Sequence, residues 1–366
     1  MKHRVVYFKK DNRRRFLIVK EEQLEILPSK YLKHLDRLNA SPNTVHLAAS
    51  SLAYYYDFLF KQDMKLEEVE MLSYAEQNKH FIDFLNWVKS GMHTEKKTIP
   101  GNKTCNMYLR CIFKFYQFLA QEEILPWLKI VEVKQATYFN EIGVKCHRTI
   151  KTFPGFFKEE KKRIEELTAT DIQKLIHACT NERDRLLIAM MAETGFRIGE
   201  ILGIFYTEDI DFERKTIRVY FRENNENQSR AKNAEYREAR LSDTTFDFLM
   251  KYLSDFRTVL LNTEYLFTKL TGKEKGQPLD ANSVYSLFKR LGKKTEIYAH
   301  PHQLRHYFAE ERRKNGWDLN SIRVALGHKK IETTIKYLGE NSEQLIDATE
   351  QYFLENKDLY ELDDFL

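Results

Sequence analysis

Five short segments of the chain carry residue types that could together transfer a phosphoryl group. Arginine offers a planar, charged set of donors that fits phosphate oxygens, histidine and lysine can move protons, and tyrosine can act as a nucleophile. Each segment alone has an ordinary explanation, such as a surface arginine at a helix junction or a glycine that ends a helix. Chance assembly of all five in one order is hard to accept. They are residues 194–200 (TGFRIGE), Lys232, residues 302–306 (HQLRH), residues 326–328 (LGH) and Tyr337.

This ordered set resembles that of the tyrosine recombinases, the family of phage and transposon integrases and of bacterial chromosome-dimer recombinases. The resemblance covers roughly residues 25–340, and the pattern TGxRxxE…K…HxLRH…LGH…Y is highly specific. The resemblance implies that Glu200, one turn after the first arginine, is a supporting residue. The implied catalytic residues are Arg197, Lys232, His302, Arg305, His328 and Tyr337.

Lys232 is the one implied catalytic residue for which the sequence offers alternatives. The loop that precedes Lys232 is longer than is usual in the family, and Arg230 and Lys215 are alternatives. Lys232 is preferred because Lys232 and Arg237 keep the family's lysine-to-arginine spacing at the start of a strand.

The chemistry explains why such residues would gather. A phosphodiester gains negative charge in its transition state, so Arg197 and Arg305 would clamp the non-bridging oxygens while Glu200 holds Arg197. A free tyrosine has a pKa of about 10, so Tyr337 needs cationic neighbours and a base, for which His302 is the candidate.

The remaining two residues would complete the reaction. His328 would hydrogen-bond a phosphate oxygen, and Lys232 would protonate the departing 5′ oxygen. Attack by Tyr337 would leave a 3′-phosphotyrosyl link that stores the bond energy, so ATP is not needed. The arginines would do the work of a metal ion, and no metal or other cofactor is expected.

Periodicity predicts a mainly α-helical fold with a small β-sheet, arranged as a two-domain clamp. Residues 1–25 form a basic segment with a hairpin of residues 5–8 and 16–19, and residues 26–138 form a helical core-binding (SAM-like) domain of about four helices. Ser41 caps the second of these helices, with Pro42 in its first turn. Residues 139–165 are predicted to be an irregular basic linker.

The second half is predicted to be a mixed α+β catalytic domain, residues 166–340. Strands are expected at 216–221 and 236–241, and helices at 243–261, 281–291, 302–314 and 318–326. Residues 341–366 form an acidic tail whose apolar residues indicate an amphipathic helix at 342–354. We expect this tail to dock on a neighbouring subunit; folding back on its own domain is the alternative.

Charge and composition favour a nucleic-acid partner. The formal net charge is +5, but the tail from residue 340 carries about −8, which leaves a strongly basic body. The four cysteines form no CxxC pair, and no apolar run reaches membrane-spanning length, so a cytoplasmic protein without a zinc site is expected.

The expected partner is double-stranded DNA that carries recombination sites, bound by a homotetramer with accessory directionality or bending proteins. The expected activity is site-specific integration, excision or transposition for a mobile element. A type IB topoisomerase-like enzyme and a catalytically silent DNA-binding regulator are the alternatives. Candidate DNA contacts are Lys103, Arg110, Lys114, Lys145, Arg148 and Lys151.

Overall fold

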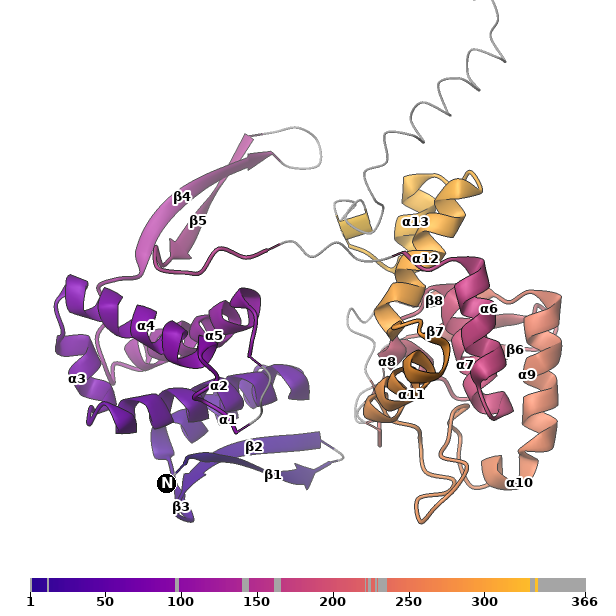
Figure 1. Ribbon diagram of the computed structural model, residues 1–366, viewed down its shortest axis with the longest axis horizontal. Helices are drawn as coiled ribbons and strands as arrows, with labels where there is room; N and C mark the ends of the chain where they lie inside the picture. The colour runs from indigo at the N-terminus through magenta and orange to yellow at the C-terminus, as the bar shows by residue number, and fades with distance from the viewer. Residues whose placement is uncertain are drawn as a thin grey trace, which may run out of the picture. The chain divides into compact units, whose positions relative to one another are not determined.

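The chain divides into two compact units, Met1–Arg163 and Ile164–Leu366. The structure is a computed structural model, and each unit is described by itself (Figure 1). The residues described are 2–11, 13–95, 99–139, 145–160, 166–220, 222, 225–227, 229, 236–329 and 333–334.

The first unit begins with a three-stranded antiparallel sheet. Strands β1 (Arg4–Lys10) and β2 (Arg13–Lys20) form the predicted hairpin, with Val5 opposite Ile18, and β3 (Gln23–Leu24) pairs with the end of β2. Phe16 and Ile18 are buried in the same core as the helices that follow. The hairpin is therefore an integral part of this unit.

Helices make up most of the first unit. Ser41 accepts a hydrogen bond from the Thr44 amide at 3.2 Å, and Pro42 occupies the first turn, which confirms the predicted cap. The short third helix was not expected among the four predicted. The helices are α1 (Ile26–Arg37), α2 (Pro42–Lys61), α3 (Leu66–Met71), α4 (Tyr74–Lys89) and α5 (Asn102–Gln121).

The core of the first unit contains a buried polar group among aromatic rings. The Tyr55 hydroxyl lies 3.0 Å from Nε2 of His80 and 2.9 Å from the Tyr116 hydroxyl, and all three side chains are buried. Burial lowers the pKa of His80 to about 4, because a charged imidazolium is poorly solvated there. His80 is therefore neutral at physiological pH.

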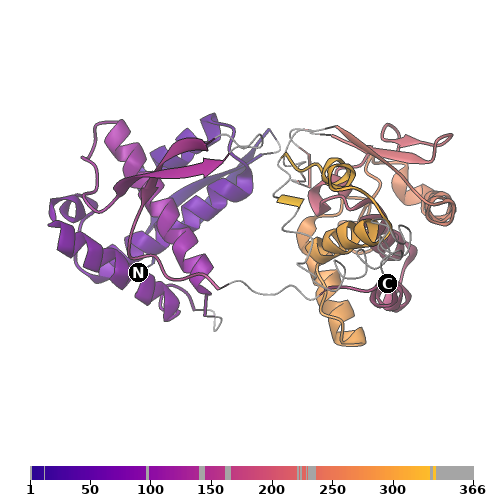
Figure 2. The ribbon, with the colours of Figure 1, turned by 90° about the horizontal axis from the view of Figure 1, so that it is seen from above.

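The interpretation of residues 139–165 as an irregular linker was wrong for their first part. Strands β4 (Glu132–Phe139) and β5 (Lys145–Thr152) run side by side as a regular antiparallel hairpin (Figures 1 and 2). After β5, Phe153 is buried in the core of the first unit. The Asn106 side chain then donates to the Phe157 carbonyl at 2.8 Å and accepts from the Phe157 amide at 3.0 Å. These contacts fix the segment to the helices.

The second unit combines helices with a small antiparallel sheet of strand order β6-β7-β8. The two predicted strands are present, and so are the helices predicted at 281–291, 302–314 and 318–326. The helix predicted at 243–261 is divided into two at Phe256, and Thr168 caps the first helix of the unit with its hydroxyl. The elements are α6 (Ala169–Ala178), α7 (Glu182–Thr194), α8 (Ile198–Ile201), β6 (Ile210–Asp211), β7 (Thr216–Val219), β8 (Arg237–Arg240), α9 (Asp243–Asp255), α10 (Arg257–Leu260), α11 (Ala281–Thr295), α12 (Pro301–Lys314) and α13 (Leu319–Leu326).

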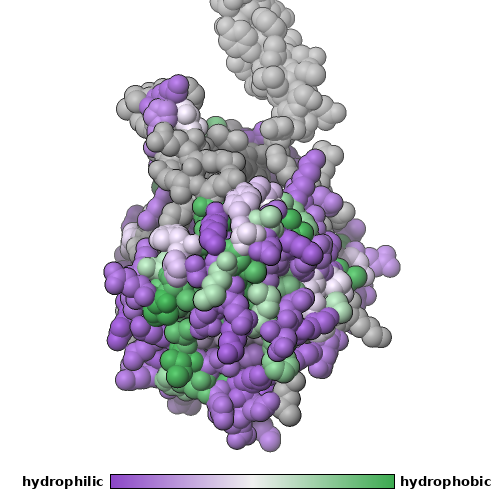
Figure 3. All heavy atoms as spheres, turned by 90° about the vertical axis from the view of Figure 1, so that its left-hand side faces the viewer, coloured by the Kyte–Doolittle hydropathy of each residue, from purple (hydrophilic) through white to green (hydrophobic). Residues whose placement is uncertain are grey.

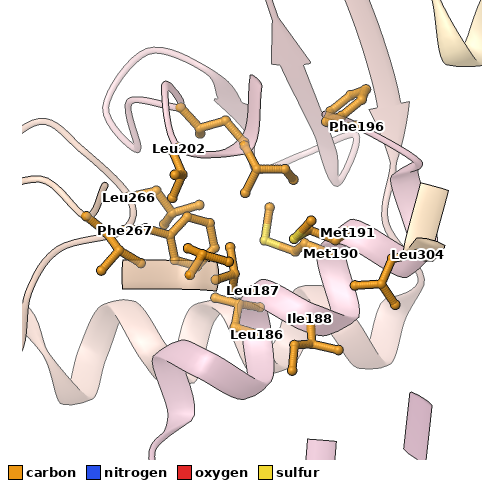
Figure 4. Packing of buried hydrophobic residues seen from close by; sticks show 14 of the residues in the cluster. Leu186, Leu187, Ile188, Met190, Met191, Phe196, Leu202, Leu266, Phe267 and Leu304 are labelled. Carbon is orange, nitrogen blue, oxygen red and sulfur yellow. The ribbon is translucent and has the colours of Figure 1, made fainter. Parts of the chain in front are cut away.

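Helix α7 lies at the centre of this unit. Its residues Leu186, Leu187, Met190 and Met191 are fully buried and belong to one cluster with Leu266, Phe267 and Leu304 (Figure 4). The helix packs against α6, α9 and α12. Burial on several sides explains why α7 is apolar over most of its length, and it gives the site at its C-terminal end a rigid support.

Hydrophilic side chains dominate the face of the protein seen in Figure 3, and apolar groups are interspersed among them. Within the described residues, every helix is too short or too polar to cross a bilayer.

Candidate active site

The turn after α7 determines where the first arginine lies. Gly195 ends the helix with φ of +63°, a left-handed conformation that favours glycine. A Cβ at this position would come within 2.5 Å of the Phe308 ring on α12. The close approach brings the Gly195 carbonyl to the site, and the chain then turns so that Arg197 becomes the N-cap residue of α8.

Arg197 and Glu200 form a doubly hydrogen-bonded pair. The Arg197 amide donates to Oε2 of Glu200 at 2.7 Å, and Nη1 donates to Oε1 at 2.8 Å. Burial of Glu200 would raise the pKa of its carboxyl group, but Arg237 and Arg197 outweigh this effect and the pKa is lowered. Glu200 is thus a buried carboxylate that orients Arg197, as the sequence predicted.

Arg305 is one of the most buried large side chains of the described chain, at 1% exposure. Its Nη1 donates to the Gly195 carbonyl at 2.6 Å, and Nη2 donates to the Leu326 carbonyl and lies 3.0 Å from Nε2 of His328. Arg305 therefore joins three segments that are far apart in the sequence: the end of α7, helix α12 and the end of α13.

The C-terminal end of α13 receives three arginines on three consecutive carbonyls. Arg237 donates to Ala325 at 2.8 Å, Arg305 to Leu326, and Arg197 to Gly327 at 3.5 Å. Carbonyl groups at a helix C-terminus are unpaired within the helix and carry partial negative charge, so cations are stabilised there. Three guanidinium groups and one carboxylate leave an excess of positive charge at this point, which suits an anionic ligand.

His328 follows directly, and its protonation state can be assigned from its partners. Arginine has only donors, so Nε2 must accept the bond from Arg305, and a neutral ring then carries its proton on Nδ1. Nδ1 lies 3.0 Å from the Thr334 hydroxyl oxygen, which accepts a hydrogen bond from it. Burial and the arginines Arg305, Arg197 and Arg237 lower the pKa of His328 to about 3, consistent with a neutral ring.

His302 lies in the first turn of α12, three residues before Arg305 on the same helical face. Its side chain is exposed, and its ring meets that of His306 edge to face with centroids 4.8 Å apart. Desolvation of the ring, together with His306 and Arg305, lowers the pKa of His302 to about 4. A neutral imidazole at an accessible position can accept a proton.

The structure thus brings Arg197, Glu200, Arg305 and His328 together. Lys232, its rival Arg230 and Tyr337 lie outside the described residues, as does the tail. The other rival, Lys215, pairs with Asp243 at 2.9 Å in the turn before β7.

Two residues of the site were not assigned a role from the sequence. In the sequence, Arg237 served only to support the choice of Lys232 by its spacing. The structure places it against Glu200, with Nη2 2.5 Å from Oε2. Thr334 lies against His328, and no sequence signal singled it out.

The candidate DNA contacts fall on two elements of the first unit. Lys103, Arg110 and Lys114 lie on the exposed face of α5, where Arg110 forms an ion pair with Glu159 at 2.9 Å. Lys145, Arg148 and Lys151 are all residues of strand β5. Lys145 is opposite Phe139, Arg148 opposite Ala136 and Lys151 opposite Val133.

The searched, described residues contain no group of three or more histidine, cysteine, aspartate or glutamate side chains that could hold a metal ion. The arginine-rich cluster at the end of α13 carries the positive charge and the donors that a phosphate group would need.

Comparison with known proteins agrees with this class. The sequence model of the phage integrase family matches residues 165–344. Transposase A from transposon Tn554 of Staphylococcus aureus is 28% identical over 352 residues, which cover 93% of this chain and 94% of the relative. Tyrosine recombinase XerA of Saccharolobus solfataricus is 26% identical over 298 residues, 81% of this chain and 82% of the relative.

Solved structures share the fold. The Tn1549 transposon integrase in complex with transposon right end DNA has a TM-score of 0.59 at 18% identity, covering 90% of this chain and 98% of the other. A lambda integrase dimer bound to a core site also has a TM-score of 0.59, at 14% identity, with 87% and 96% covered. The chain belongs to the tyrosine recombinase family and is a DNA recombinase with transposon-associated relatives.

Proposed function

We propose that this protein is a site-specific recombinase that cleaves and rejoins DNA through Tyr337. Its hydroxyl oxygen attacks a backbone phosphorus, forms the phosphotyrosyl bond at the 3′ end and releases a free 5′ hydroxyl. The observation that carries the proposal is the arginine cluster, in which Glu200 orients Arg197 and backbone carbonyls orient Arg305. Preorganised arginines stabilise the charge that develops on the phosphate, so neither ATP nor a metal ion is required.

Proton transfers use the neighbouring groups. His302 has a lowered pKa, which favours the neutral form that can accept the tyrosine proton. Lys232 donates a proton to the departing 5′ oxygen. For His328 to donate to a phosphate oxygen through Nε2, this nitrogen must gain a proton and give up the bond from Arg305, and a bound phosphate anion favours protonation.

We further propose that the protein acts on duplex DNA as a homotetramer. Phosphate contacts would come from α5 (Lys103, Arg110 and Lys114) and from the β4–β5 hairpin (Lys145, Arg148 and Lys151). A two-stranded ribbon fits the major groove of B-DNA. Two solved neighbours are described as complexes with DNA, one of them of a transposon integrase, which supports a DNA partner and service to a mobile element.

Two other functions share part of this site. A type IB topoisomerase-like enzyme would relax DNA without exchanging partner strands, and a silent regulator would bind without cutting. An assay for four-way junctions separates the recombinase from the topoisomerase, and adduct trapping identifies the silent regulator.

Tyr337→Phe tests the proposal. The change removes one hydroxyl group and no positive charge, so covalent adducts should fall to background while DNA affinity stays within about threefold. Nicked suicide substrates are incubated with both proteins in excess EDTA, and adducts are resolved on denaturing gels. Tyr352→Phe is a matched control. An adduct formed by the Tyr337 variant, or cleavage that requires magnesium, would contradict the proposal.

A further inference from the structure

Arg237 has surroundings that ordinary structural support does not fully explain. It is the first residue of β8, its side chain is 7% exposed, and its guanidinium carbon lies 5.2 Å from the centroid of the Phe196 ring. Nη2 lies 2.5 Å from Glu200 Oε2, and Nη1 donates to the Ala325 carbonyl at 2.8 Å. One side chain therefore connects strand β8 to both the Arg197–Glu200 pair and the end of α13.

Gly327 is shaped around this arginine. A Cβ on Gly327 would lie 2.6 Å from Nε of Arg237 and 2.9 Å from its Cδ and Cζ. The left-handed φ of +59° and the nearby guanidinium group both favour glycine here. The glycine before His328 thus makes room for Arg237 as well as ending the helix.

Arg237 is also close to Lys232 in the sequence. Lys232 precedes it by five residues, and the regular pairing of β8 with β7 begins at Arg237, opposite Val219. Arg237 is therefore the first residue of β8 after Lys232 in the sequence, and its own side chain is anchored in the site.

We propose that Arg237 is a positioning residue for the general acid, which it fixes relative to the Arg197–Glu200 pair and His328. The inference rests on the proposed function, in which Lys232 protonates the 5′ oxygen. Both polar contacts of Arg237 end on groups of the site, and its planar guanidinium group fixes direction as well as distance. A small displacement of a reacting group costs a large factor in rate.

A purely structural role predicts a different result. A buried arginine–carboxylate pair can hold the fold together without any effect on one chemical step. A structural role and a positioning role of Arg237 predict different cleavage rates when the leaving group no longer needs a proton. A 5′-bridging phosphorothiolate releases a thiol, whose pKa of about 8.5 lets it leave as the anion. Cleavage then breaks the P–S bond, forms the P–O bond to Tyr337 and needs no general acid.

The experiment measures single-turnover cleavage of oxygen and sulfur substrates by the full-length protein. Arg237→Lys keeps the charge but loses the planar fork. It should cleave the oxygen substrate about 10- to 100-fold more slowly than the wild type, and the sulfur substrate within about threefold. Lys232→Ala should show the same pattern with a larger loss.

Arg222→Lys is the matched control. The Arg222 side chain is 14% exposed and donates to both Asp209 oxygens, at 2.7 and 2.8 Å, in the same unit. It should affect both substrates equally and by less than about threefold. If Arg237→Lys does not fold, as thermal melting will show, Gly327→Ala keeps Arg237 and displaces its guanidinium group, and the same substrate pattern is expected.

The outcomes distinguish failure of the positioning role of Arg237 from failure of the proposed general acid Lys232. Equal losses on both substrates for the Arg237 and Gly327 variants, while sulfur rescues Lys232→Ala, would overturn the positioning role alone. A Lys232→Ala protein that sulfur does not rescue would remove the general acid from the proposed function, and the positioning role with it.

Discussion

Arg305 shows how a buried charge can be kept ready for a ligand. It is almost completely inaccessible to solvent, yet Nη1 donates to the Gly195 carbonyl and Nη2 donates to the Leu326 carbonyl and lies within hydrogen-bond distance of His328 Nε2. Because these acceptors are backbone groups and a neutral ring, they do not neutralise the guanidinium charge. The charge remains available to stabilise a phosphate at little cost in reorganisation.

Replacing Arg305 with lysine should lower the cleavage rate by about 10²–10³-fold, since an ammonium group cannot reach all three acceptors and the phosphate in one geometry. Single-turnover cleavage with a saturating suicide substrate measures the effect. Arg312→Lys, on the same helix, should cleave at a nearly normal rate. A rate for the Arg305 variant within threefold of the wild type would contradict this role.

His80 should make the first unit sensitive to acid. Its pKa is near 4 in the folded protein and about 6.5 when unfolded, so the unfolded state binds more protons between these values. Stability is therefore complete above pH 6.5 and falls as the pH decreases toward 4. Between pH 7.5 and 4.5 the wild type should lose about 2.5 kcal/mol more unfolding free energy than His80→Gln.

Denaturant titrations at a series of pH values measure this difference. His177→Gln, at an exposed position on α6, should keep the wild-type pH dependence. Parallel curves for His80→Gln and the wild type would show that His80 does not titrate in this way.

Among the individual residues of the described site, most could be predicted from the sequence and Arg237 could not. Arg197, Glu200, Arg305 and His328 stand in motifs whose spacing carries the signal. Arg237 was noticed only for its distance from Lys232, because spacing along the chain does not show which carbonyl or carboxylate an arginine will contact.

At the scale of elements, helices with an apolar stripe were predictable, and the β4–β5 hairpin was not. The first strand, EVKQATYF, mixes polar and apolar residues without net charge. The second, KCHRTIKT, is polar and basic and was interpreted as part of a linker. Their regularity comes from pairing with each other, a longer-range interaction that neither strand encodes alone. The short helix α3 was missed because six residues carry little periodicity.

The turn after α7 gives a prediction at this scale. Gly195→Ala adds a Cβ in a left-handed conformation and against Phe308, so it should cost about 2–4 kcal/mol of stability. It should also lower cleavage, because the Gly195 carbonyl holds Arg305. Gly272 has φ of +82° and nothing within 4 Å of its built Cβ, so Gly272→Ala should cost only about 1–2 kcal/mol and leave cleavage unchanged.

Thermal melting and cleavage assays on both variants check the pair. Equal losses of stability for the two substitutions would show that the contact with Phe308 does not matter.

At the scale of the whole molecule, each unit has its own hydrophobic core, and the acidic tail follows Tyr337 in the sequence. We propose that residues 342–366 dock on a neighbouring subunit of the DNA-bound tetramer, as an amphipathic helix binds a groove. Truncation after Gly339 should then leave binding to a single site intact but abolish synapsis and strand exchange.

Gel-shift titrations and a recombination assay measure the two properties, and Phe353→Ser with the tail retained should weaken assembly to a lesser degree. A truncated protein that forms tetramers and recombines at the full-length rate would exclude docking in trans.

The hydrogen bond between His328 and Thr334 limits how far Tyr337 can move. Tyr337 lies nine positions after His328, and such a stretch could extend to about 30 Å. With Thr334 held 3.0 Å from His328, only three steps of the chain remain, and covalent geometry confines the Tyr337 Cα to within about 11 Å of the Thr334 Cα. While this bond persists, covalent geometry keeps the Tyr337 Cα within that radius of Thr334. Delivery of Tyr337 to a phosphate beyond this reach would first require Thr334 to leave His328.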